Sequence, residues 1–202
     1  MRTASLNFLD STPSPVVVLT GASSGIGHAT ALAFACQGAK LVLAARGAEA
    51  LDKVAAECRL LDAEALAGAD AVQRRSLDLS DRAEVHRVMA EVDAAESGID
   101  ILVCCAGGVR GQVGRPLAEI TEADWQVIFQ ANLESTLWCA QAAAPIMQRA
   151  GQGRIVTIAS GAGLRPSLTG IQAYTSAKHA LIGLTKQLSF EFARHGITAN
   201  SV

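Results

Sequence analysis

The stretch Thr20-Gly21-Ala22-Ser23-Ser24-Gly25-Ile26-Gly27 decides the fold of this chain, because it places a glycine-rich turn between an apolar segment and a helical one. Glycines allow a tight turn and a close approach of the backbone to an anion, and free N–H groups at a helix start point toward negative charge. Two hydroxyl groups in the turn are further donors. A plain strand–helix turn is the alternative, but the position between strand and helix favours a pyrophosphate-binding turn made by Gly21, Ser23, Ser24, Gly25, Ile26 and Gly27.

Outward from this turn, short β-branched segments alternate with longer alanine-rich amphipathic ones. The expected strands are Val16–Leu19, Leu41–Ala44, Ala71–Leu77, Ile101–Cys105, Arg154–Ala159 and one that begins near Ile197. The expected helices are Gly25–Cys36, Glu49–Leu66, Arg82–Ala94, Glu122–Gln148 and Tyr174–Arg194. Unbroken apolar strands are typical of parallel sheets that are buried on both faces. The sequence therefore predicts an α/β fold, a Rossmann-type doubly wound parallel sheet with three layers in a single domain.

Composition and charge exclude several classes of function. Of the 202 residues, 50% are apolar and 18% are charged, with a formal net charge of −2. This balance provides no basic surface for nucleic acid, and the longest apolar runs are too short to span a bilayer. Residues 1–14 lack the pattern of a signal peptide, so we expect a flexible leader there and the folded domain over residues 15–202. Five cysteines without a CxxC pair favour reduced thiols, a cytoplasmic protein and no metal site.

The end of the second expected strand bears on the choice of cofactor. In dinucleotide sites, an acidic residue about 20 positions after the glycine turn binds the 2′-hydroxyl of the adenosine ribose. This chain has Ala44-Ala45-Arg46 there and no carboxylate. A guanidinium fork suits a 2′-phosphate, so we predict that NADP(H) is preferred over NAD(H) and that Arg46 selects it. The alternative is that Arg46 stacks on adenine or is solvated.

Four polar residues form a candidate catalytic set. Tyr174 and Lys178 stand four apart at the start of an expected helix, so their side chains emerge on one face. A phenol with its ordinary pKa of about 10 is a poor acid at neutral pH, and a neighbouring ammonium stabilises the phenolate. Ser160 ends an expected strand at the carboxyl edge of the sheet, where ligands bind. Asn132 is a poor helix former in mid-helix, which indicates a specific partner.

The TGxxxGxG turn, together with YxxxK, Ser160 and Asn132, resembles the compact form of the short-chain dehydrogenase/reductase family, especially its 3-oxoacyl-carrier-protein reductase-like members. The resemblance runs from about Val16 to Val202. It implies an NAD(P)-dependent oxidoreductase that acts on a ketone/secondary alcohol pair. The implied roles are general acid/base for Tyr174, a hydrogen bond to the carbonyl oxygen for Ser160, binding of the nicotinamide ribose for Lys178, and a relay water held by Asn132.

The same resemblance assigns further cofactor contacts. Asp78 and Leu79 follow the third expected strand, where the family places residues that border adenine, although a plain helix N-cap also fits the following Ser80-Asp81. The segment Cys104-Cys105-Ala106-Gly107 stands where the family usually carries Asn-Asn-Ala-Gly, so we expect Cys104, Ala106 and Gly107 at the cofactor. A thiol is a weak hydrogen-bonding group, and the expected effect is on sheet stability or cofactor affinity.

The end of the chain and its helices raise two further expectations. Related enzymes continue past the position of Val202 with a substrate loop and a final strand, so the chain resembles a C-terminally truncated member that lacks both. This leaves a second function open, a catalytically silent NADP(H)-binding or scaffold module. Small residues along the fourth and fifth expected helices predict a homodimer or homotetramer through them, with packing on the chain's own sheet as the alternative. Val109–Pro116 is expected either to border the substrate entrance or to be a solvated loop.

Overall fold

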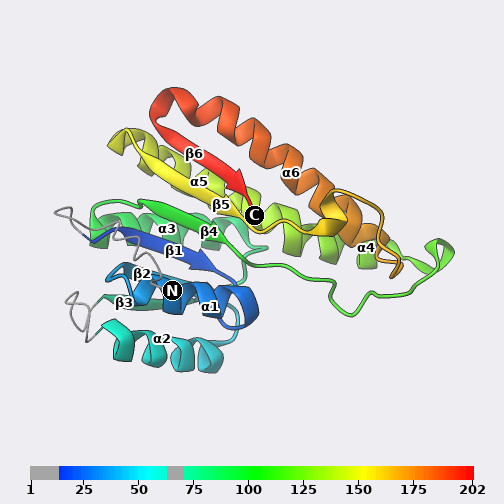
Figure 1. Cartoon of the computed structure of the whole chain (residues 1–202), viewed down its shortest axis with the longest axis horizontal. Coiled ribbons are helices and arrows are strands. Elements are labelled where there is room, and N and C mark those ends of the chain that lie inside the picture. The colour runs from blue at the N-terminus through cyan, green and yellow to red at the C-terminus, as the bar shows by residue number, and fades with distance from the viewer. Residues whose placement is uncertain (1–13, 63–70) are drawn as a thin grey trace, which may run out of the picture.

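The strand that precedes the glycine turn, β1 (Val16–Thr20), is wholly buried and pairs on both sides with parallel strands. The structure is a computed structural model of the chain, and it describes residues 14–62 and 71–202. Within these residues the sheet has six strands in the order β3-β2-β1-β4-β5-β6 (Figure 1). Its other strands are β2 (Lys40–Ala45), β3 (Val72–Ser76), β4 (Ile101–Cys104), β5 (Gly153–Thr157) and β6 (Ile197–Ser201). Every pair of neighbours is parallel, which confirms the predicted sheet.

Helices cover both faces of this sheet and complete the three predicted layers. They are α1 (Gly25–Ala35), α2 (Ala48–Asp62), α3 (Arg82–Glu96), α4 (Glu122–Phe129), α5 (Ser135–Ala150) and α6 (Gln172–Phe192). Successive residues of a strand point to opposite faces, so β1 contributes to two separate cores. Val17 and Leu19 pack with α1 and α2, whereas Val16 and Val18 belong to the core that α3, α5 and the end of α6 cover.

The two edge strands are less buried than the central ones. In β3 the first residue, Val72, is the buried one, and in β6 the buried residues are Ile197 and Ala199. An edge strand has a neighbour on one side only, so polar side chains are tolerated there. The predicted strand Ala71–Leu77 was one residue too long at each end.

One predicted helix, Glu122–Gln148, is divided in the structure. A π-helical turn, η2 (Gln130–Glu134), separates α4 from α5. Asn132 Nδ2 donates a hydrogen bond of 2.9 Å to the carbonyl oxygen of Ile128, which in an α-helix accepts from the backbone N–H of residue 132. A side chain that inserts into the backbone ladder in this way widens the turn, and such π-bulges are frequent at functional sites. Periodicity alone does not reveal this interruption.

Some expectations fall on parts of the chain that the structure does not describe. The predicted leader, residues 1–14, lies outside the described residues except for Ser14, and so does the part of the predicted helix Glu49–Leu66 beyond Asp62. The predicted helix Tyr174–Arg194 begins two residues earlier, as α6. Across residues 14–62 and 71–202, we find no helix that combines the length and the apolar character needed to cross a membrane.

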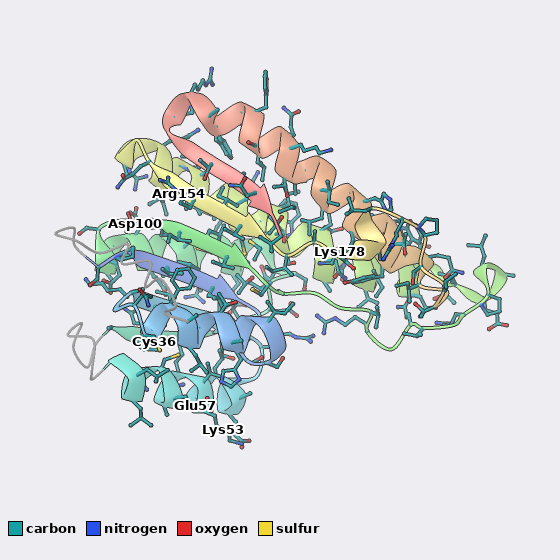
Figure 2. The ribbon with its side chains drawn as sticks, in the orientation of Figure 1. Cys36, Lys53, Glu57, Asp100, Arg154 and Lys178 are labelled. Atoms are coloured by element: carbon teal, nitrogen blue, oxygen red, sulfur yellow. The ribbon has the colours of Figure 1, made fainter. Side chains whose placement is uncertain are left out.

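The two edges formed by the strand ends differ in what they carry. At the amino ends, Asp100 Oδ2 accepts a hydrogen bond of 2.8 Å from Val16 N and so ties the start of β1 to the start of β4. Figure 2 shows Asp100 and Arg154 at this edge, and Lys178 on the side of the carboxyl ends. Ligands of open α/β sheets bind outside the carboxyl ends of the strands, which makes that edge the place to look for a site.

Candidate active site

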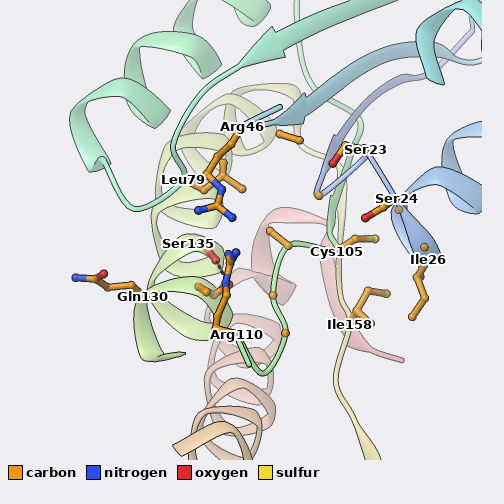
Figure 3. Close-up of a pocket in the computed structure, with 18 of the residues that line it drawn as sticks. Ser23, Ser24, Ile26, Arg46, Leu79, Cys105, Arg110, Gln130, Ser135 and Ile158 are labelled. Atoms are coloured by element: carbon orange, nitrogen blue, oxygen red, sulfur yellow. Dashed lines mark hydrogen bonds between the residues drawn. The ribbon is translucent and has the colours of Figure 1, made fainter. Parts of the chain in front are cut away.

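A cavity of about 630 Å³ opens beyond the carboxyl ends of the strands, a size typical of cofactor sites. In the close-up of Figure 3, the glycine turn, the segments that follow β2, β3 and β4, and the η2 turn surround it. The structure brings most of the predicted site residues to its wall. These are Gly21, Ser23, Ser24, Gly25, Ile26, Gly27, Arg46, Asp78, Leu79, Ala106, Gly107, Tyr174 and Lys178.

The glycine turn is closely packed on one side and open on the other. Gly21 has a φ of +66°, and a Cβ there would lie 2.6 Å from Ala106 N, so a larger residue does not fit. Gly25 has a φ of +54°, none of the atoms that the structure describes would lie within 4 Å of a Cβ there, and it lines the cavity. Ser24 is the N-cap of α1, yet its side chain makes no cap hydrogen bond. The first N–H groups of α1 therefore stay available as donors, which fits a pyrophosphate.

Asp78 lines the cavity as a carboxylate. Its Oδ1 accepts hydrogen bonds from Ser80 N at 2.9 Å and from Ser80 Oγ at 2.8 Å. These hydrogen bonds, helped by the charges of Arg46 and Arg110, hold the pKa of Asp78 below its usual range. The N-cap of α3 is Asp81, as the plain alternative for Ser80-Asp81 expects, and Asp78 itself lies in the cavity wall.

Tyr174 and Lys178 meet at the start of α6, as their spacing predicts. The Nζ of Lys178 lies 5.6 Å from the centroid of the Tyr174 ring, and both residues line the cavity. Lys178 is only 4% exposed, and its Nζ donates a hydrogen bond of 2.7 Å to the carbonyl oxygen of Ile158. Burial lowers the pKa of Lys178 to about 8, against the opposing influence of Cys105 and Cys104. A buried lysine with a lowered pKa, beside a tyrosine in a cavity, makes this cavity a candidate functional site.

Asn132 fastens the loop that follows β4. Its Oδ1 accepts a hydrogen bond of 2.9 Å from Gly108 N, and its Nδ2 donates one of 2.9 Å to Gly108 O. A Cβ on Gly107 would lie 2.6 Å from Asn132 Oδ1 and 3.5 Å from Lys178 Nζ. Asn132 and Lys178 therefore flank the same point, although the buried Asn132 is not among the residues that line the cavity.

Ser160 follows β5 and is half-buried next to Ala159, which lines the cavity. Its Oγ accepts a hydrogen bond of 3.1 Å from Ala162 N and caps the short helix η3 (Gly161–Gly163). Ser160 itself is not in the cavity wall. The hydroxyl hydrogen is not used by this bond, so Ser160 keeps a donor.

The two neighbouring cysteines face different environments. Cys104, which we assigned to the cofactor site, is instead buried in the core, in the same cluster as Cys139. Cys105 lines the cavity in its place, because adjacent residues at a strand end point to opposite faces. Burial raises the pKa of the Cys105 thiol to about 11, and Lys178 opposes this effect. The thiol is therefore neutral at physiological pH.

Several residues of the cavity wall were not predicted. They are Cys105, Val127, Gln130, Ala131, Ser135 and Ile158, among others. Arg110, also in the wall, belongs to Val109–Pro116, for which a substrate entrance and a solvated loop were both left open. Gln130, Ala131 and Ser135 reach the cavity at the π-helical turn, which the sequence does not reveal. The glycines around Arg110 were a usable signal, because Gly107, Gly108 and Gly111 all have positive φ.

The sequence matches the family model for short chain dehydrogenases over residues 15–202. The chain belongs to the short-chain dehydrogenase family. This short-chain dehydrogenase is therefore an oxidoreductase of a family that binds NAD(P) and acts on alcohol and ketone substrates.

Individual proteins that are similar to this chain are named as dehydrogenases or reductases. A (2S)-[(R)-hydroxy(phenyl)methyl]succinyl-CoA dehydrogenase subunit of Thauera aromatica is 38% identical, over 93% of this chain and 71% of the relative. A 3-oxoacyl-[acyl-carrier-protein] reductase of Synechocystis is 36% identical, over 93% and 72%. The crystal structure of a short-chain type dehydrogenase/reductase from Mycobacterium marinum matches with a TM-score of 0.84 and 32% identity, over 93% of this chain and 72% of that one. Among curated relatives, this short-chain dehydrogenase spans from 62% to 72% of their own length.

Proposed function

We propose that the chain is an NADP(H)-dependent oxidoreductase that interconverts a ketone and a secondary alcohol, with Tyr174 as general acid/base. The observation that carries this proposal is the buried Lys178, whose Nζ lies 5.6 Å from the Tyr174 ring in the cavity that the glycine turn opens into. The nicotinamide, when bound, supplies or accepts the hydride. The protein must then supply a proton to the substrate oxygen during reduction and remove it during oxidation.

Lys178 is suited to two tasks. An ammonium has three donors, and one of them is used by Ile158 O, which leaves two for the hydroxyl groups of the nicotinamide ribose. Its positive charge also stabilises the phenolate of Tyr174 after the proton has been given to the substrate. Tyr174 thereby acts as an acid during ketone reduction and, as phenolate, as a base during alcohol oxidation.

Ser160 and Asn132 support this centre in different ways. Ser160 Oγ is oriented by Ala162 N, and we assign its free O–H to the carbonyl oxygen of the substrate, where charge develops. Asn132 uses its side chain to hold Gly108, so we assign it first as a positioning residue for the loop beside Lys178. A relay water between Asn132 and Lys178 stays part of the proposal.

The preference for NADP(H) rests on the residue that follows β2. Arg46 lines the cavity there, and the segment that ends β2 has no carboxylate that would bind a ribose 2′-hydroxyl. A guanidinium pairs with a 2′-phosphate and gains little from a hydroxyl. The ratio of the NADPH and NADH dissociation constants tests this preference, and equal values would refute it.

The alternative is a module that binds NADP(H) without turnover, as a sensor or scaffold. Such a module has no use for Tyr174 and Lys178 side by side.

We also propose a cytoplasmic protein, supported by five free cysteines, and a homodimer or homotetramer through α4–α5 and α6. Phe190, 82% exposed on α6, supports such pairing, whereas Ala140, Ala143 and Ala144 pack into the chain's own core. Light scattering on the purified protein measures the oligomeric state.

Replacement of Tyr174 by phenylalanine tests the catalytic proposal. The variant removes one hydroxyl and keeps the ring, so NADPH should bind with little change while turnover of ketones is lost. The wild-type protein and the variant are compared by cofactor titration and by the rate of NADPH oxidation with a panel of prochiral ketones. Activity in the variant contradicts the role of Tyr174. NADPH binding without wild-type turnover on any substrate of the panel favours the silent module.

A further inference from the structure

Arg110 is a second arginine in the cofactor cavity, and it comes from a different part of the chain than Arg46. Arg46 follows β2, whereas Arg110 belongs to the loop after β4. Figure 3 shows the two side chains reaching into the cavity from opposite sides, with their guanidinium groups pointing toward each other. Two cations that converge in this way indicate a place for an anion.

The backbone around Arg110 is built to direct this side chain. Arg110 has a φ of +50°, in the left-handed region that an arginine rarely adopts. The hydrogen bonds between Asn132 and Gly108 fix the loop two residues before it. Unfavourable backbone conformations persist where the surroundings impose them, and they cluster at ligand sites.

The charges nearby leave both guanidinium groups available. Partial burial and the proximity of Arg46 lower the pKa of Arg110, and Asp78 has the opposite effect. The Asp78 carboxylate is itself engaged by Ser80 N and Ser80 Oγ. In the described part of the chain, the ion pairs made by arginines involve Arg74, Arg87, Arg115 and Arg149, and not Arg46 or Arg110.

We infer that Arg46 and Arg110 together bind the 2′-phosphate of NADP(H), an inference that rests on the cofactor preference proposed above. Each guanidinium presents parallel N–H donors that match two oxygens of a phosphate. A dianion between the two arginines also removes their mutual repulsion, which a 2′-hydroxyl does not. Arg110 is thus a specificity-determining residue supplied by the loop after β4.

Calorimetric titration of the full chain measures how much the 2′-phosphate contributes to the binding affinity, apart from the rest of the cofactor. The ligands are NADPH and NADH, and the pair adenosine 2′,5′-bisphosphate and AMP, which differ only in the 2′-phosphate. Arg110→Asn removes the charge and keeps a residue that tolerates the left-handed conformation, and Arg110→Lys keeps the charge without the fork. Arg194→Asn is the matched control, because Arg194 lies in η4 (Ala193–His195) at the amino end of β6, away from the cavity.

Loss of one charged hydrogen-bonding partner is expected to weaken NADPH and the bisphosphate about 10-fold or more in Arg110→Asn. The dissociation constants of NADH and AMP should change less than about twofold in Arg110→Asn. The NADPH affinity of Arg110→Lys should lie between those of the wild type and Arg110→Asn, and that of Arg194→Asn should match the wild type. Equal weakening of NADPH and NADH would overturn the inference, because it places Arg110 on a shared part of the cofactor. Unchanged binding in both Arg110 variants, with discrimination lost in Arg46→Asn, would overturn it and leave the proposed preference intact. No discrimination by the wild type would overturn both.

Discussion

Replacing Asn132 by alanine removes a buried amide that makes three hydrogen bonds of 2.9 Å to backbone groups, two with Gly108 and one with Ile128. At about 0.5–1.5 kcal/mol for each bond, the loss is about 3 kcal/mol, and it rises if the Gly108 groups stay without partners. The higher helix propensity of alanine recovers only about 0.6 kcal/mol. We therefore expect a net destabilisation of about 2 to 3 kcal/mol, which lowers the melting temperature of a domain of this size by about 5 to 10 °C.

Thermal unfolding followed by circular dichroism measures this change. Gln130→Ala is the matched control, because Gln130 lies in the same π-helical turn, is exposed, and makes no side-chain hydrogen bond within the described residues. Its free energy of unfolding should stay within about 0.5 kcal/mol of the wild type. Equal melting temperatures for Asn132→Ala and Gln130→Ala would refute the role of Asn132 in holding the loop.

A second substitution at the same position separates charge from hydrogen bonding. Asn132→Asp keeps an acceptor for Gly108 N but turns a carboxylate oxygen toward the carbonyl oxygens of Gly108 and Ile128. This repulsion raises the pKa of the introduced carboxyl in the folded state. The variant should therefore lose stability as the pH rises above about 4, where the unfolded carboxyl ionises. A melting temperature that follows the wild type from pH 4 to pH 8 would contradict this.

Three further predictions concern other parts of the structure. Gly107→Ala should lower the melting temperature more than Gly108→Ala, because a Cβ on Gly107 would lie 2.6 Å from Asn132 Oδ1 whereas none of the described atoms lies within 4 Å at Gly108; equal values from calorimetry would count against the steric argument. Thr121→Ala should cost about 1 kcal/mol in urea unfolding, since Thr121 forms a capping box at the start of α4, and an unchanged midpoint would show that the cap contributes nothing. NADPH affinity should fall as the pH rises through about 8, because burial lowers the pKa of Lys178 to about 8 and the neutral amine loses its charge. The same depressed pKa means that the unfolded chain binds the Lys178 proton more strongly than the folded chain, so the free energy of unfolding should increase from about pH 8 to pH 10. NADPH affinity that stays constant over this range would contradict the role assigned to the Lys178 charge.

The central strands were predictable because their sequence reflects burial on both faces. Strands β1, β2 and β4 are apolar except for Thr20 at the end of β1 and Lys40 at the start of β2, and their predicted ends agree with the structure to within one residue. The edge strand β3 is a harder case, because Gln73, Arg74 and Arg75 follow its one buried residue. The apolar pattern of a strand reflects its burial, and an edge strand is less buried than a central one.

The candidate site was predictable where residues act through local spacing. Tyr174 and Lys178 are four apart on a helix, so their proximity follows from helix geometry. The positions of Cys104 and Arg110 depend instead on contacts between distant segments. The face that Cys104 presents is set by the register of β4, and the direction of Arg110 is set by a left-handed φ in a loop that Asn132 holds. The glycines around Arg110 mark an unusual loop, but they do not encode these contacts between distant segments.

A crystal structure of the protein with NADPH tests the proposed site most directly. We predict the pyrophosphate on the Ser23–Gly27 segment of the glycine turn, the 2′-phosphate between Arg46 and Arg110, and the nicotinamide ribose at Lys178 beside Tyr174. A cofactor bound with its nicotinamide away from Tyr174, or a cavity that stays empty at saturating NADPH, would contradict the assignment of this cavity as the active site.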